Sequence, residues 1–153
     1  MSKPLAGALL CTLLLAAPAM ADITASDVYV RAVPPGQMNS AAFMTLHNDG
    51  SEAVGLVAAG SAIAENVELH SHSMQDGVMR MRRIDRIDVP AHGRHSLEPG
   101  ADHVMLIGLR GALQEGDSVE LRLEFSDGQR LEIAAPVKSV MAGMQNGQHL
   151  HGN

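Results

Sequence analysis

The feature that most constrains the fold is a strict alternation of apolar and charged side chains late in the chain. The apolar members are Val119, Leu121, Leu123 and Phe125, and the residues between them are Glu120, Arg122 and Glu124. Side chains two residues apart on a β-strand share a face, so one face of this segment is expected to be buried. The alternation resumes at 131–133, after Asp127-Gly128, a dipeptide suited to a tight two-residue turn. These residues therefore predict a β-hairpin.

Short apolar or alternating runs separated by turn signals continue along most of the chain. Further candidate strands cover residues 27–33, 41–48, 53–59, 66–73, 78–84, 86–89, 94–97 and 102–109. Turn signals such as Pro34-Pro35-Gly36 and Pro99-Gly100 lie between them. The only helical segment that we expect is a single turn within 58–65. Many short strands with Gly and Pro turns predict an all-β sandwich or barrel.

The first residues are typical of a secretory signal peptide. Lys3 precedes an apolar run over 5–17, and Ala19-Met20-Ala21 has the small-x-small pattern of a cleavage site. The alternative, a membrane anchor, is disfavoured because the run is too short to span a bilayer. We therefore expect residues 1–21 to be removed by cleavage before Asp22.

The rest of the chain divides into one domain and a tail. Residues 22–137 have the size of a single domain with its own core. Residues 138–153 lose the alternation and are rich in Gly, Asn, Gln, Met and His, so we expect a flexible tail.

Cysteine usage limits the metal chemistry that is open to this chain. Cys11 is the only cysteine and lies inside the apolar run of the expected signal peptide. A lipid anchor on Cys11 is disfavoured, because Leu10 stands where a small residue should precede a lipidated cysteine. The exported chain would then form no disulfide, and no blue-copper or dinuclear copper centre, since these need thiolate.

Charge and composition argue against several other functions. The chain has 17 acidic and 11 basic residues and a net charge of −6, which disfavours a nucleic-acid partner. It has no tryptophan, and its three other aromatic residues, Tyr29, Phe43 and Phe125, are too few for a base-stacking platform. We see no phosphate loop, no nucleophile elbow and no pairing of base with nucleophile, so we do not expect an enzyme.

Histidine and methionine recur between residues 70 and 105 at intervals that fit one metal site. Ten residues separate His70 from Met81, twenty-one separate Met81 from His103, and one separates His103 from Met105. Imidazole and thioether without thiolate favour copper, above all Cu(I). We therefore predict that these four residues bind Cu(I).

The alternation of side chains along the strands explains how His70 and Met81 meet. It also brings two further candidate ligands to the same face. If Asp76-Gly77 forms a hairpin turn, His72 lies opposite Met81 and His70 lies diagonally from Met81. His70, His72 and Met74 then share one face. His72 and Met74 therefore stay open as further metal contacts.

The second pair of ligands is placed by the next strong strand. His103 and Met105 point to one side of it, and Val104 and Leu106 point to the other. A turn at Pro99-Gly100 would bring this strand beside the hairpin, so four ligands from three strands converge.

The other histidines and methionines are expected to have ordinary roles. Met38, Met44 and Met79 are predicted to be packing residues, and His47, His92 and His95 to be surface residues. Glu68 and Asp102 are expected to offset the charge of a bound cation.

With these residues the chain resembles the PCu(A)C family of periplasmic copper chaperones. The family spacing is met at His70, Met81, His103 and Met105, and the flanking segments VELH, DGVMRMR, LEPGADHVML and LHNDG also match. The resemblance covers about residues 27–137. Tyr29 stands where a tryptophan is frequent and Ala101 where a glycine is frequent, and neither belongs to the ligand set.

The resemblance implies a cupredoxin-like Greek-key β-sandwich that binds Cu(I) in the periplasm. It also implies delivery to the dinuclear copper site of cytochrome c oxidase subunit II, together with a Sco-type thiol protein. Copper sequestration for tolerance is the alternative function. The resemblance further implies an auxiliary copper site in the tail, for Cu(II) where imidazole dominates, although the same residues could be incidental parts of a solvated tail. These residues are Met141, Met144, His149 and His151.

Overall fold

The computed structural model describes residues 22–139, and all regular structure in this range is β-strand. The strands are β1 (Ile23–Arg31), β2 (Asn39–Asn48), β3 (Val54–Gly60), β4 (Ala64–Gln75), β5 (Val78–Arg83), β6 (Ile87–Val89), β7 (Gly93–Leu97), β8 (His103–Leu109), β9 (Ser118–Phe125) and β10 (Arg130–Lys138). The predicted signal peptide, residues 1–21, lies outside the described range, and so do the four predicted tail ligands. No helix that could cross a membrane occurs between residues 22 and 139.

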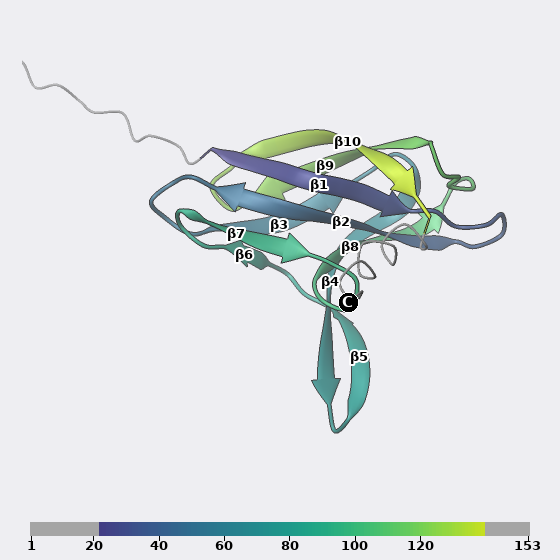
Figure 1. The fold of residues 1–153 in the computed structure, drawn as a ribbon, viewed down its shortest axis with the longest axis horizontal. Helices are drawn as coiled ribbons and strands as arrows, with labels where there is room; N and C mark the ends of the chain where they lie inside the picture. Colours follow the sequence, from purple (N-terminus) through teal and green to yellow (C-terminus); the bar gives the residue numbers. More distant parts are fainter. Residues whose placement is uncertain (1–21, 140–153) are drawn as a thin grey trace, which may run out of the picture.

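The strands form two layers that are joined through β1 (Figure 1). The hydrogen-bonded order is β5-β4-β8-β2-β1-β10-β9-β3-β6, and β7 also pairs with β2. All strand pairs are antiparallel except β1 with β10, which are parallel over a short register. Pairs such as β2 with β8 and β3 with β9 join strands that are far apart in sequence. The expected all-β, cupredoxin-like Greek-key architecture is thus confirmed.

The core lies between the two layers and contains the predicted apolar faces. The alternating residues of β9 are all buried on their apolar side, from Val119 to Phe125. On β8, Val104 and Leu106 are fully buried in the same core. Because side chains alternate, the burial of these two residues turns the intervening β8 residues toward the other side of the sheet. The core therefore fixes which face of β8 can carry a site.

Two local predictions need correction. The helical turn expected within 58–65 is wrong, because β3 continues to Gly60, pairing with β9, and β4 begins at Ala64, opposite Leu109. Neighbouring strands thus supply the backbone hydrogen bonds that a helix would have made internally. The turn at Asp127-Gly128 is also not a two-residue turn. Gly128 has a positive φ of 88° and Asp127 does not, and Glu124 is the β9 residue paired opposite Arg130, so the loop is longer.

The turn at Asp76-Gly77 matches its prediction. Both residues have positive φ, 52° and 76°, as a two-residue turn of the hairpin type requires. Gln75 and Val78 close the hairpin on either side of the turn. The β4–β5 hairpin projects from the body of the molecule (Figure 1).

We expect the buried Asn48 to be important for stability. Its Nδ2 donates to the carbonyls of Glu52 and Val89, at 2.8 and 3.2 Å, and its Oδ1 accepts from the Gly50 amide at 2.9 Å. Asn48→Ala removes three hydrogen bonds and leaves the buried Val89 carbonyl without this partner, which should lower the free energy of unfolding by about 2 kcal/mol. Urea denaturation measures the change. The control is Asn39→Ala, at the exposed start of the same strand, and an equal loss in both variants would contradict this role.

Candidate metal centre

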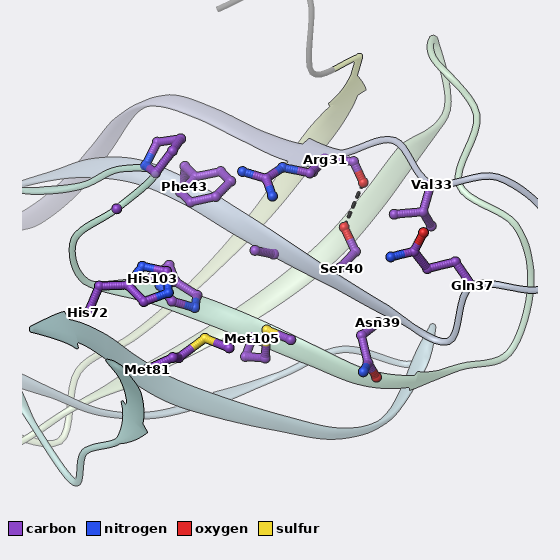
Figure 2. A pocket seen from close by; sticks show the side chains of 13 residues that line it. Arg31, Val33, Gln37, Asn39, Ser40, Phe43, His72, Met81, His103 and Met105 are labelled. Carbon is purple, nitrogen blue, oxygen red and sulfur yellow. Dashed lines mark hydrogen bonds between the residues drawn. The ribbon is translucent and has the colours of Figure 1, made fainter. Parts of the chain in front are cut away.

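A cavity of about 400 Å³ opens beside β8, and three of the four predicted main ligands line it. These are Met81, His103 and Met105, and the fourth histidine or methionine in the lining is His72. Figure 2 shows the rings of His72 and His103 close together, with Met81 and Met105 on the same side of the cavity. Other parts of the wall come from Pro99, Gly100 and residues of β1 and β2.

Strand register brings these side chains together. In the β4–β5 ladder His72 is paired with Met81, as strand parity predicted, and Met74 is paired with Met79. In the β4–β8 ladder His70 is paired with His103. β4 therefore lies between the two strands that carry the other ligands, and its histidines face both of them.

His103 is the most deeply placed of the candidate ligands. Its residue exposure is only 3%, and its Nδ1 lies 3.0 Å from the Ala101 carbonyl oxygen. A carbonyl only accepts, so Nδ1 carries the proton and Nε2 keeps its lone pair for a metal. Burial holds the pKa of His103 below its ordinary value, the hydrogen bond to Ala101 opposes that shift, and His72, His70 and Arg31 lower the pKa further. Neutral imidazole is the form that binds metal.

His70 is oriented by a carboxylate. Its Nε2 donates to Oε2 of Glu68 at 2.8 Å, and Oε1 of the same Glu68 lies 3.5 Å from Arg83. The hydrogen bond from His70 is the main cause of the lowered pKa of Glu68. Within the described residues, the buried Nδ1 of His70 has no hydrogen-bond partner. A carboxylate on one ring nitrogen and a free lone pair on the other is the usual arrangement of a metal-binding histidine.

His72 is also free to bind. Its ring centroid lies 5.1 Å from that of His103, whereas the His70 and His103 centroids are 5.8 Å apart. Within residues 22–139, its buried Nδ1 likewise has no hydrogen-bond partner. His72 lines the cavity and His70 does not. The two histidines of β4 therefore present their rings to His103 from different positions.

The methionines differ sharply in exposure. Met81 is 47% exposed, Met105 is partly buried, and both line the cavity. Met74 is 67% exposed and is not part of the lining. The cavity therefore has a buried end at His103 and an open side at Met81.

Outside the cavity, the assignments by sequence were partly wrong. Met44 is a core residue as predicted, but Met38 and Met79 are more than half exposed. Met38 lies in the loop that precedes β2, and Met79 lies on the exposed strand β5. His95 is half-buried, and its Nε2 lies 2.9 Å from Asp102. Asp102 is therefore paired with His95, so of the two acidic residues expected beside the site only Glu68 contacts a candidate ligand.

Sequence reasoning missed the aromatic and cationic wall of the cavity. Phe43 lies between the rings of Tyr29 and His103, at centroid distances of 5.1 and 6.2 Å, and the Arg31 guanidinium is 5.2 Å from the Phe43 centroid. No spacing rule links β1 and β2 to the ligands, because the contact arises only when β2 pairs with β8. Burial is the main cause of the raised pKa of Tyr29.

The donor set determines what the site can bind. No group of three or more His, Cys, Asp or Glu side chains suited to a metal occurs within residues 22–139. The arrangement therefore depends on the two thioethers together with imidazole. Such uncharged, soft ligands suit a monovalent soft cation better than zinc or a hard divalent ion.

In the metal-free protein, protonation of His103 at low pH should destabilise the native state. Because the folded pKa is lowered, the unfolded chain binds this proton at a higher pH than the native state does. Native stability should therefore decrease as pH falls through about 6.5, the ordinary pKa of histidine. In the metal-free protein, the NMR ring signals of His103 should titrate below that pH. Titration at or above the ordinary value would contradict the burial of this ring.

Known proteins are similar to this chain in sequence. The family model described as "Putative lipoprotein LpqE-like" matches residues 23–137. A relative from Leifsonia xyli subsp. xyli (strain CTCB07), "Putative lipoprotein Lxx21020", is 32% identical over 125 residues, which is 81% of this chain and 74% of the relative.

Two solved structures are similar to this chain in fold. The Cu(I)-bound form of DR1885 from Deinococcus radiodurans is 37% identical, covers 72% of this chain and 74% of its own, and has a TM-score of 0.57. The copper-bound PCuAC domain from PmoF2 is 24% identical, covers 76% and 92%, and has a TM-score of 0.65, which shows a shared fold. The match of the family model over most of the chain establishes that this protein belongs to the LpqE-like family.

Proposed function

We propose that this protein is a periplasmic copper chaperone that binds Cu(I) and passes it on. The observation that carries the proposal is the cavity that places Met81, Met105 and His103 beside an imidazole of β4. By spacing, the β4 ligand is His70, so the predicted set is His70, Met81, His103 and Met105.

The chemistry of the ligands supports a binding and transfer role more than catalysis. Two imidazoles and two thioethers bring no charge, so bound Cu(I) keeps its single positive charge, and nearby Glu68 offsets it. A similar protein, DR1885, has been solved in a Cu(I) form. Because Met81 is almost half exposed, a thiolate of a partner could displace its thioether first. The copper is then cargo.

Export and the acceptor are further parts of the proposal. The descriptions of the family and of its relative as lipoproteins support export. Cleavage before Asp22 is the route we favour, because Leu10 does not suit lipidation of Cys11.

The proposed acceptor is the dinuclear copper site of cytochrome c oxidase subunit II, with a Sco-type thiol protein as a second partner. Met141, Met144, His149 and His151 are proposed as an auxiliary Cu(II) site in the tail.

Substitution of the two histidines of β4 tests the site. We expect His70→Ala and His72→Ala each to weaken Cu(I) binding by about tenfold, and the double variant to lose more than either, because one imidazole can partly replace the other. Competition against a chromophoric Cu(I) chelator measures the affinities. The matched control is His47→Ala, whose ring lies 2.9 Å from the Ser26 hydroxyl on other strands. Wild-type binding by the double variant would refute the site.

Transfer to an acceptor separates delivery from storage. The Cu(I)-loaded mature protein is mixed with the metal-free soluble domain of subunit II, and copper in each protein is measured after separation. A chaperone should load the acceptor within minutes. Copper that stays on this protein, beside an acceptor that takes free Cu(I) normally, would favour the alternative of sequestration for copper tolerance.

A further inference from the structure

We propose that the outer edge of β5 is the docking surface for a partner with an acidic extended segment. This inference rests on the proposed function, because it places the partner beside the copper cavity. β5 is the last strand of its sheet and pairs only with β4 among residues 22–139. All six of its residues are exposed. Its other edge thus has unpaired backbone groups that can accept an added strand.

The charge of this edge is opposite to that of the chain. The net charge of the protein is −6, yet β5 carries Arg80, Arg82 and Arg83 within six residues. Of these, Arg83 pairs with Glu68 at the cavity side. Arg80 and Arg82 are paired in register with Ser73 and Ser71, so they lie together on the opposite face, beside neutral neighbours. This local cationic face would attract acidic side chains on the partner.

The same strand reaches the copper site from its other face. Met81 lies between Arg80 and Arg82 and is turned toward the cavity that it shares with His103. A strand added beside β5 would alternate in the same way, with acidic residues near the arginines and the residues between them near Met81. A metal-ligating residue at such a position would meet the most exposed candidate ligand. Docking and removal of the cargo would then use one strand.

Other occupants fit this surface less well. Two copies joined through β5 would bring their arginines together, and β6, at the other end of the strand order, has only three residues. An anionic membrane could attract the arginines and the exposed Val78 and Met79, but the tip of the hairpin carries the carboxylate of Asp76. A protective role alone, in which charge keeps the edge from aggregating, would be served by either sign of charge. An acidic protein segment is therefore the occupant that we propose.

Charge reversal tests the proposal. The Cu(I)-loaded variant Arg80→Glu, Arg82→Glu is mixed with the metal-free subunit II domain, and the second-order transfer rate is measured at low and high salt. We expect a decrease of about tenfold at low salt and a smaller decrease at high salt, because reversed charges slow the encounter. The Cu(I) affinity, measured by chelator competition, should stay that of the wild type.

The matched control is Arg94→Glu, Arg110→Glu, which makes the same change in net charge at exposed positions outside β5. An equal slowing in both variants, or no slowing in either, would overturn docking at β5 and leave copper binding intact. Sedimentation of the wild-type protein with phosphatidylglycerol vesicles, or a wild-type dimer that the β5 variant loses, would overturn it in favour of a membrane or a second copy. Absence of Cu(I) binding by the wild type would instead refute the proposed function.

Discussion

The pairing of β4 between β5 and β8 is the constraint on which the candidate site depends. His70 is set opposite His103 on one side of β4, and His72 opposite Met81 on the other. A shift of one residue in either ladder would turn these side chains to the wrong face. Val104 and Leu106 prevent such a shift on β8, because it would move them out of the core. The hydrophobic core thus holds the site in register.

Exposure of the candidate ligands increases across the site, from the buried His103 to the open side at Met81. His103 is buried, its Nδ1 is hydrogen-bonded to the Ala101 carbonyl, and its ring packs near Phe43. These contacts hold its free nitrogen, Nε2, in place. Met81 lies on a projecting, exposed hairpin. This gradient suits a protein that must hold a cation and then release it, since neutral ligands at the open side can be exchanged one at a time. The arginines on the same hairpin would bring the partner to that side.

Much of the fold was predictable from local patterns. Alternation located nearly all strands to within a few residues, and Asp76-Gly77 predicted the hairpin and its cross-strand pairs. The errors arose where pairing with distant strands decided the outcome, as at 58–65. The prediction of a two-residue turn at Asp127-Gly128 was also wrong. The dipeptide allows more than one loop length, and the register of β9 with β10 selected the longer loop.

The sequence by itself determined the kind of chemistry available: soft, neutral ligands at fixed spacing, and one cysteine that lies in the expected signal peptide. Strand parity could not distinguish His70 from His72, since both share a face of one strand, and only the family spacing favoured His70. The tertiary structure placed His72 in the cavity lining and His70 on Glu68, and it brought Phe43 and Arg31 to the wall. These contacts join strands that are remote in the chain, and only the packing of the two layers around a common core decides them.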